Sequence, residues 1–318
     1  MSRGSAARLV LLALIWGASF LFIELALRGL SPMQIVLGRL LAGSAVLLAI
    51  LAIRRQPLPR DGVVWGHLAL LALVANIAPF FLYGWGQERI TSGLAGVLNG
   101  TTPLFTIAFA LGALPEERLS RARAAGLLLG FLGVILVIGP WDQNPLTSSI
   151  PGQLACLGAA LCYGISTVYA RRFLTGRGTP VLSLSAAQVL IGTVIMLAAA
   201  PWLARGPVTL APEVVASVLL LGGVGTGAAY LLYYRLIGDA GATSTSMVTY
   251  LIPVVAVTLG VVVLSEPVSW NLFAGAAVVI LGVAVAEGRL RRRPGIRPRS
   301  RPTVDAPAHS TRPGSESV

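Results

Sequence analysis

The stretch that decides the fold reads SGLAGVLNGTTPLF at residues 92–105, and a related stretch reads ATSTSMVTYLIPVV at residues 242–255. In this pair Pro103 corresponds to Pro253 at an offset of 150. Each stretch is followed by an acidic turn and another apolar run, at residues 114–137 and 264–285, in which Glu117 corresponds to Glu266. Two apolar segments with a proline and a carboxylate in matching places indicate an internal repeat.

The composition excludes an ordinary soluble domain. Of the 318 residues 55% are hydrophobic and 11% are charged, and the mean hydropathy is +0.81. Ordinary globular proteins carry about 25% charged residues. Apolar windows of about 17–25 residues, the length that crosses a bilayer as a helix, recur from end to end. The sequence therefore predicts an all-α integral membrane protein, and a membrane barrel would show short alternating segments instead.

Ten membrane spans are predicted, with polar or proline-containing turns between them. They cover residues 9–27, 32–53, 64–83, 92–114, 123–139, 152–171, 181–203, 214–237, 243–264 and 271–287. All 24 basic residues are arginine, and with a cytoplasmic N-terminus 20 of them lie on the inner side and 3 on the outer side, with Arg39 inside a span. This bias predicts a multi-pass protein of the plasma or inner membrane with both termini in the cytoplasm. Because the arginines serve as topological anchors, the net charge of +12 does not indicate nucleic-acid binding.

The repeat divides the chain into two halves. We predict a cytoplasmic N-terminus at 1–8, a five-helix repeat at 9–139, an extracytoplasmic linker at 140–151, a second five-helix repeat at 152–287 and a disordered basic cytoplasmic tail at 288–318. Because each half crosses the membrane an odd number of times, the second half is inverted relative to the first. The tail begins with arginines that would contact anionic lipid headgroups.

The two prolines within predicted spans suggest hinges. Pro103 cannot donate to the carbonyl of Asn99, and Pro253 cannot donate to that of Thr249. The polar side chains around them are Asn99, Thr101, Thr102, Thr243, Ser244, Thr245, Ser246, Thr249 and Tyr250. A freed carbonyl in a membrane needs a partner or a wet cavity. Two interpretations stay open: a polar binding site near the midplane with hinges, or packing kinks satisfied by Ser and Thr hydroxyls.

Polar and aromatic side chains also recur at helical spacing. They are Asn76, Phe80, Tyr83 and Gln87 in the third span, Thr226, Tyr230 and Tyr233 in the eighth, and Trp16, Tyr163 and Ser166 in the first and sixth. Single Tyr and Trp residues can serve as interfacial anchors. As a set they predict a cavity lining that suits a small amphipathic organic solute.

Glu24 and Arg39 are the charges most clearly inside spans. From the helical rise both are expected about 6–10 Å below the outer surface. Three roles stay open: a structural ion pair between them, capture of a substrate carboxylate by Arg39, and proton coupling through Glu24.

The remaining features favour structural roles. Glu117 and Glu266 are expected to cap or anchor the helices that follow them. Glycines at 126, 130, 275 and 282 allow close helix contact, either within the chain or between two copies. Neither a catalytic motif nor a metal-ligand spacing is present, and no cofactor is predicted.

The chain resembles the EamA family of the drug/metabolite transporter superfamily over about residues 9–287. The resemblance rests on Trp16-Gly17-Ala18-Ser19-Phe20, on Ser31-Pro32 with Arg39, and on the two helix–proline–acid patterns. It implies ten helices in two inverted halves around a central substrate cavity lined by helices 1, 3, 4, 6, 8 and 9. Relatives often carry a basic residue near the position of Glu24, which leaves the preferred substrate charge open.

This resemblance implies a secondary transporter that exports amino acids or similar metabolites by alternating access, as a monomer or homodimer in lipid. The alternative is a non-transporting membrane protein that binds lipid or scaffolds partners. The predicted substrate-binding residues are Trp16, Arg39, Asn76, Tyr83, Asn99, Thr102, Tyr163, Tyr230, Tyr233, Thr249 and Tyr250. Hinges are predicted at Pro103 and Pro253, and Glu24 is the candidate for coupling.

Overall fold

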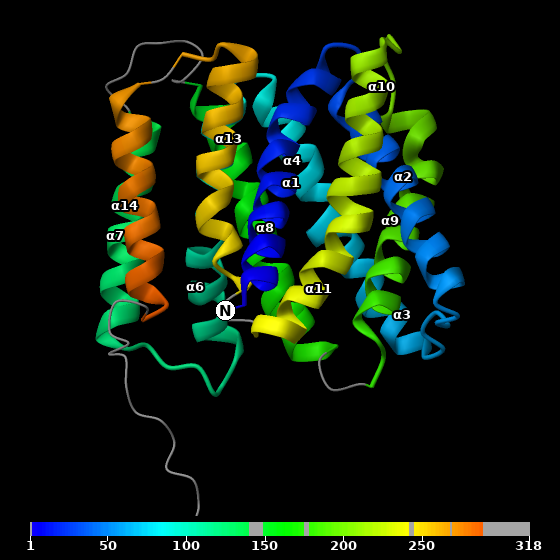
Figure 1. Ribbon diagram of the computed structural model, residues 1–318, viewed down its shortest axis with the longest axis horizontal. Coiled ribbons are helices and arrows are strands. Elements are labelled where there is room, and N and C mark those ends of the chain that lie inside the picture. The colour runs from blue at the N-terminus through cyan, green and yellow to red at the C-terminus, as the bar shows by residue number, and fades with distance from the viewer. Residues whose placement is uncertain (1, 140–148, 175–177, 242–244, 268, 289–318) are drawn as a thin grey trace, which may run out of the picture.

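The described part of the protein is a bundle of upright helices (Figure 1). The computed structural model describes residues 2–139, 149–174, 178–241, 245–267 and 269–288, and these contain no strand. The first half holds α1 (Arg3–Leu27), α2 (Pro32–Ile53), α3 (Gly62–Leu71), η1 (Ala72–Ile77), α4 (Ala78–Gln87), α5 (Ser92–Asn99), α6 (Thr102–Ala113) and α7 (Arg121–Ile138). The second holds α8 (Ile150–Phe173), α9 (Val181–Leu203), α10 (Pro212–Leu219), η2 (Leu220–Ala228), α11 (Ala229–Ala240), α13 (Val248–Leu264) and α14 (Trp270–Ala286).

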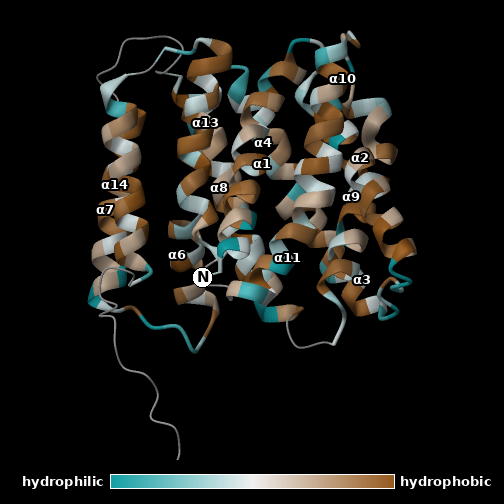
Figure 2. Cartoon of the chain, viewed as in Figure 1, coloured by the Kyte–Doolittle hydropathy of each residue, from teal (hydrophilic) through white to brown (hydrophobic). Residues whose placement is uncertain are grey.

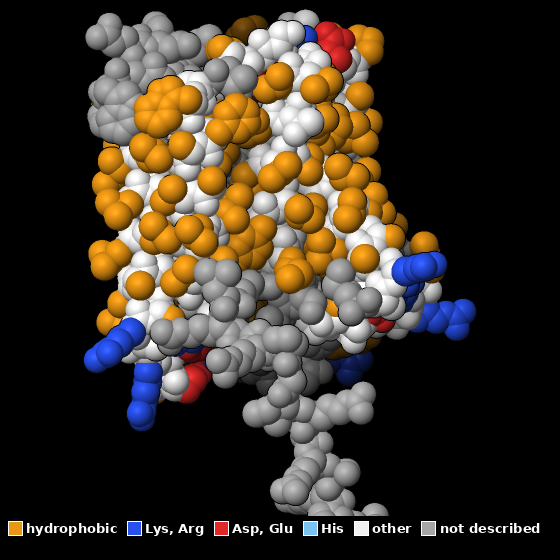
Figure 3. Space-filling view, turned by 60° about the vertical axis from the view of Figure 1, so that its left-hand side comes forward, with side chains coloured by type: hydrophobic (Ala, Val, Ile, Leu, Met, Phe, Trp, Pro, Cys, Tyr) orange, Lys and Arg blue, Asp and Glu red, His pale blue; other side chains and the backbone are white. Residues whose placement is uncertain are grey.

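Eight helical segments of the described chain are long and apolar enough to cross a membrane. They are Arg3–Leu27, Pro32–Ile53, Gly62–Gln87, Ser92–Ala113, Arg121–Ile138, Ile150–Phe173, Val181–Leu203 and Pro212–Ala240. The apolar helices α13 and α14 are shorter, with 17 residues each. Hydrophobic residues dominate the middle of the bundle and hydrophilic ones its two ends (Figure 2). The surface accordingly shows a broad apolar belt with arginines along its lower rim (Figure 3).

Two of the long segments contain a widened turn that the sequence analysis did not predict. The π-helix η1 lies between α3 and α4, and the π-helix η2 lies between α10 and α11. Shifted by the repeat offset of 150, residues 72–77 correspond to 222–227, which lie within η2. Because π-turns inside α-helices occur frequently at functional sites, their matched positions direct attention to the residues they carry.

The two prolines have different local structures. Pro103 lies in the first turn of α6, after a break at Gly100–Thr101, whereas Pro253 lies inside α13. Residues Ser92–Ala113 still form one membrane-length segment, interrupted at Gly100–Thr101 directly before Pro103. Near each proline a threonine hydroxyl donates to a carbonyl three residues earlier: Thr101 to Leu98 at 2.6 Å and Thr249 to Ser246 at 2.7 Å.

Helices from the two halves interleave instead of forming two separate cores. Helix α1 packs on α13 while α8 packs on α6, and α2 packs on η2 while α9 packs on η1. Helix α7 packs along α14. Every one of these pairs joins a helix of one half to a helix of the other.

The small residues predicted for close contact are used within the chain. Gly130 of α7 lies directly against Gly282 of α14, and Gly126 lies against Ala286. A Cβ on Gly282 would overlap the Gly130 backbone, so glycine is required there for the two helices to approach. Of the two interpretations, packing within one chain is the one that the structure displays.

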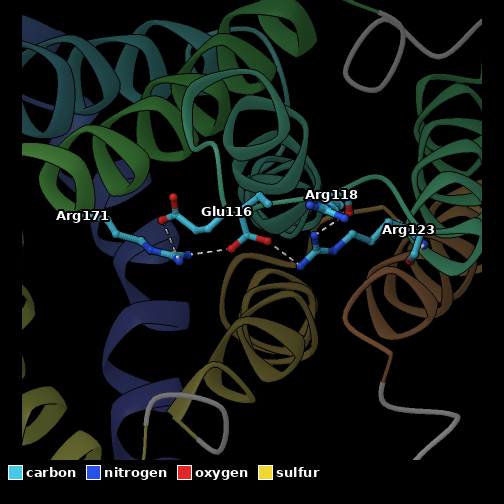
Figure 4. Close-up of polar contacts among 6 residues, drawn as sticks. Glu116, Arg118, Arg123 and Arg171 are labelled. Carbon is cyan, nitrogen blue, oxygen red and sulfur yellow. Dashed lines mark hydrogen bonds and ion pairs between the residues drawn. The ribbon is translucent and has the colours of Figure 1, made fainter.

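The two matched carboxylates hold different partners. Glu117 pairs with Arg123 at 2.7 Å and with Arg171 at 2.9 Å, and Arg171 also reaches Glu116 at 3.5 Å. Figure 4 shows this cluster joining the loop before α7 to α8. The hydrogen bond from Arg171 is the main cause that lowers the pKa of Glu117 below its ordinary value.

Glu266 caps a helix from the opposite half. Its two carboxylate oxygens accept the backbone N–H groups of Ser92 at 2.7 Å and of Gly93 at 2.9 Å. These are the first residues of α5, so the prediction that Glu266 caps the following helix is wrong. The capping chemistry is as expected, because a helix N-terminus favours a negative charge, but packing in three dimensions selects the helix.

Candidate functional site

Eight of the predicted binding residues form one connected group, here called the polar–aromatic cluster: Trp16, Arg39, Asn76, Tyr83, Asn99, Tyr163, Tyr230 and Tyr233. The rings of Trp16 and Tyr233 have centroids 5.5 Å apart, and those of Tyr83 and Tyr163 are 6.1 Å apart. Tyr163 and Tyr230 lie close enough to Arg39 for electrostatic interaction. Tyr230 in turn lies beside Asn76 and Tyr233.

Hydrogen bonds orient the rings of this cluster. The Tyr83 hydroxyl donates to Oδ1 of Asn99 at 2.8 Å, which ties α4 to the last residue of α5. The indole Nε1 of Trp16 donates to the carbonyl of Gly225 at 3.1 Å, within η2. A buried Tyr or Trp usually satisfies its polar atom in this way, which leaves its ring free to pack against apolar groups.

The two π-helices receive hydrogen bonds from matching helices of opposite halves. Nε of Arg39 in α2 donates to Oγ1 of Thr226 in η2 at 3.2 Å. Nε2 of Gln188 in α9 donates to Oδ1 of Asn76 in η1 at 2.6 Å. Asn76 and Thr226 occupy corresponding positions of the repeat, and both are buried. A reciprocal pair of polar contacts therefore joins the halves through their widened turns.

Gln188 is a cluster contact that the sequence analysis missed. It is the polar residue in an otherwise apolar part of the seventh span, at an offset of 149 from Arg39. That offset, shared with Glu117 and Glu266, is the signal that could have found it. A Gln in place of an Arg hides the correspondence, because only the position and the donor chemistry match.

The ion pair between Glu24 and Arg39 does not form. Within the described residues Arg39 contacts Thr226 and stacks its guanidinium carbon 3.8 Å from the Phe80 ring centroid. Glu24 lies instead within electrostatic range of Glu266 and Arg28, and its Oε2 is buried without a described hydrogen-bond partner. The prediction rested on the similar depth expected for the two charged residues in the membrane. In the structure their side chains have different neighbours.

Three further predicted residues lie apart from these contacts. Tyr250 donates to Glu287 at the end of α14, at 3.0 Å, and packs with the apolar residues of α7 and α14. Thr249 donates to the backbone of Ser246. Oγ1 of Thr102 is buried and has no hydrogen-bond partner in the described structure. The polar candidates Thr243 and Ser244 lie outside the described residues.

The described structure has two notable hollows, and no residue of the polar–aromatic cluster is among the residues that line them. One, of about 230 Å³, is an apolar groove between α1 and η2. The other, of about 450 Å³, lies at the end of the bundle where the chain begins, and Arg54, Gln56, Leu182, Leu231 and Arg235 are among its lining residues. In the described chain no group of three His, Cys, Asp or Glu residues is placed to hold a metal ion, and Cys156 and Cys162 are free thiols.

A helical bundle with an apolar belt and a buried polar–aromatic cluster defines a multi-pass membrane protein. The model of the EamA-like transporter family matches residues 5–139 and 150–287, and the chain therefore belongs to this family. An "Uncharacterized transporter" of Archaeoglobus fulgidus is 28% identical over 279 residues, covering 86% of this chain and 94% of that protein. "Uncharacterized transporter YoaV" of Bacillus subtilis is 24% identical, covering 90% of this chain and 97% of its own length.

Two further comparisons concern function and fold. A Salmonella typhimurium protein named "Probable amino-acid metabolite efflux pump" is 26% identical over 298 residues, covering 90% of this chain and 95% of that protein. A solved crystal structure that is 24% identical superimposes with a TM-score of 0.64, covering 92% of this chain and 100% of that one. The latter supports the fold alone.

Proposed function

We propose that this protein is a secondary transporter that exports amino acids or similar small organic metabolites across the cell membrane by alternating access. The observation that carries the proposal is the polar–aromatic cluster, which both halves build inside a membrane-embedded bundle. Burying hydroxyl, amide and guanidinium groups at membrane depth is costly, and such groups mark solute pathways. The efflux pump named among the relatives favours an amino-acid-like solute.

The proposed architecture is ten helices in two inverted five-helix halves, 9–139 and 152–287, around a substrate cavity. The reciprocal helix contacts and the matched π-helices support an exchange of the halves by a two-fold axis. The arginine distribution supports cytoplasmic termini, an extracytoplasmic linker at 140–151 and a basic cytoplasmic tail. The chain works as a monomer or homodimer in lipid, without a cofactor, catalytic residues or a nucleic-acid partner.

In this mechanism the solute lies against the rings of the cluster, and its polar groups replace hydrogen bonds within it. Thr102, Thr249 and Tyr250 contribute when the halves move, with Pro103 and Pro253 as hinges. The break at Gly100–Thr101 and the lost hydrogen bond at Pro253 are places where a helix can bend at low cost. Glu24 couples solute movement to protons.

Efflux from dipeptide-loaded cells that lack their own amino-acid exporters tests the proposal. Expression of the parent chain should accelerate amino-acid release. Tyr83→Phe removes the hydroxyl that bonds Asn99 in the free protein and that the solute would engage in its place. Loss of about 1 kcal/mol of binding to the moving solute corresponds to a roughly fivefold slower release. Tyr169→Phe is the matched control, because Tyr169 bonds to His67 outside the cluster. Equal release by parent and empty cells over a broad solute panel would refute transport.

A further inference from the structure

Arg39 is a buried cation without an anionic partner in the described structure. Only 8% of the residue is exposed, yet no Asp or Glu of the described chain lies within ion-pair distance of it. Its neighbours are a hydroxyl at Thr226 and the face of the Phe80 ring. A ring face and one neutral hydrogen bond compensate a guanidinium only in part, because a buried charge is expensive unless it is paired.

The part of Arg39 that remains available is the part that recognises carboxylates. Nε is used on Thr226, and the two terminal nitrogens donate to no residue of the described structure. These two groups form the planar fork that binds a carboxylate through two parallel hydrogen bonds. The Tyr163 hydroxyl, which interacts electrostatically with Arg39, also has no hydrogen-bond partner among the described residues and can donate to the same anion.

Aromatic and apolar groups surround the fork. Phe80 lies under the guanidinium, and Tyr163 and Tyr230 pack in the same apolar cluster as Phe80 and Leu182. A ligand that satisfies this environment carries one anionic group and an apolar or aromatic body. An inorganic anion would accept hydrogen bonds from the two terminal nitrogens of Arg39 but would have no apolar part to pack against the aromatic rings.

The larger hollow extends this argument to the end of the bundle. Its volume of about 450 Å³ lies where α2 ends and α9 begins, beside α11. These helices also carry Arg39, Gln188 and Tyr230, none of which lines the hollow. Of the described residues, Arg54 and Arg235 line it and none of those that line it is acidic, while its walls include Leu182 and Leu231 of the apolar cluster around Phe80. Arg54 lies 15 residues beyond Arg39, about 22 Å along α2. Two arginines at the mouth of a cleft concentrate anions.

We propose that the transported solute is a small amphipathic carboxylate, whose carboxylate group binds Arg39 and which enters past Arg54 and Arg235. This inference rests on the proposed transport function and names the substrate class of that site. It covers amino acids through their carboxylate and excludes solutes whose carboxylate is blocked. Arg39 is then the specificity-determining residue, and the two arginines of the cleft act on the encounter with the solute.

Counterflow in proteoliposomes with three matched solutes tests this assignment. The solutes are phenylalanine, N-acetylphenylalanine and phenylalaninamide, of which only the amide lacks a carboxylate. The parent chain should transport the first two and not the third. Arg39→Gln should lower transport of both carboxylates about tenfold or more, because a charge-assisted hydrogen bond contributes that much. Arg39→Lys, which keeps the charge but not the fork, should recover part of it.

Two controls separate loss of binding from loss of folding. Arg39→Gln should unfold at a temperature no lower than the parent, because it removes an uncompensated buried charge. Arg205→Gln, at an exposed site away from the cleft, should transport like the parent. Arg54→Gln and Arg235→Gln should raise KM and reduce its salt dependence with little change in the maximal rate.

The outcomes distinguish the two proposals. If the parent carries phenylalaninamide as well as the carboxylates, or if Arg39→Gln keeps full carboxylate transport, the carboxylate assignment is wrong and transport itself stands. If the parent moves none of the three solutes nor any of a broad metabolite panel, both are wrong.

Discussion

At the scale of single residues, polar contacts in this protein are arranged as reciprocal pairs between the halves. In one pair Arg39 donates to Thr226, and in the other Gln188 donates to Asn76. Both bonds join a helix of one half to the π-helix of the other half. Asn76 is fully buried, and its Nδ2 has no hydrogen-bond partner among the described residues even in the presence of Gln188. A network satisfied only in part can rearrange, which is a useful property where a solute must bind and leave.

The Gln188–Asn76 pair yields a stability prediction. Gln188→Leu leaves Oδ1 of Asn76 buried without its donor, and we expect a loss of about 1–3 kcal/mol of unfolding free energy. Adding Asn76→Leu should recover part of that loss, because both polar groups are then absent. Unfolding of the purified variants in detergent measures both effects. Strictly additive losses would show that the contact contributes nothing.

Glu24 yields a prediction about coupling. One of its oxygens is buried without a described partner, and Glu266 lies within electrostatic range. If Glu24 gains and releases a proton during the cycle, Glu24→Gln should flatten the pH dependence of transport, while Glu24→Asp should retain it. Initial rates in proteoliposomes over a pH series provide the measurement. An unchanged profile in Glu24→Gln would make the residue structural.

At the scale of helices, close backbone contact and local breaks decide which elements can move. Helices α7 and α14 meet through glycine at Gly130 and Gly282, whereas the spans near the cluster carry π-turns or a break. The first arrangement favours a rigid pair and the second favours bending. The two terminal helices of the halves thus form a support beside the more deformable spans.

This difference predicts the result of adding side chains to α7 and α14. Gly126→Leu and Gly282→Leu should each lower the unfolding free energy by at least about 1–3 kcal/mol, because the new side chain overlaps the backbone of the facing helix. Gly112→Leu in α6 is the matched control, since a Cβ there meets nothing within 4 Å. Thermal unfolding in detergent compares the three. Equal midpoints would mean that α7 and α14 do not need their close contact.

At the scale of the whole molecule, helices from the two halves pack against one another and share one bundle. The first residues of α1 and the last of α14 lie at the same end of the bundle (Figure 1). That end also carries the arginine-lined cleft. An odd number of crossings in each half produces this arrangement, provided that every predicted span crosses.

Cysteine labelling tests this topology. In a background with Cys156→Ser and Cys162→Ser, single cysteines replace Ser2 and Arg60 at one end and Leu210 and Trp270 at the other, all exposed positions. A membrane-impermeant maleimide should label Leu210→Cys and Trp270→Cys in intact cells, and Ser2→Cys and Arg60→Cys only after permeabilisation. Labelling of Arg60→Cys in intact cells would overturn the predicted orientation.

Much of the fold was predictable because a bilayer requires apolar segments of a certain length, and segment length can be read directly along the sequence. Every predicted span overlaps a helix, and the apolar length of each segment together with the arginines between segments carries that information. Eight of the predicted binding residues also meet in one cluster, since helical spacing puts Asn76, Tyr83, Tyr230 and Tyr233 on the faces that turn inward.

The errors share a different cause. The Glu24–Arg39 pair and the helix capped by Glu266 depend on which helices become neighbours, and so does the missed contact of Gln188. Hydropathy and helical spacing predict how deep a residue lies in the membrane and on which face of its helix. Residues of several other helices lie at the same depth, so these patterns do not identify the contact partner.

The sequence alone therefore determined the membrane class, the repeat and the residue types available for a site, because these follow from composition and period along the chain. Only the tertiary structure decided which carboxylate meets which helix, that both π-turns receive donors from the opposite half, and that Arg39 is left with a ring and a hydroxyl instead of an anion. The physical reason is that interleaved packing joins residues about 150 positions apart, and a pattern read along the chain carries no record of those contacts.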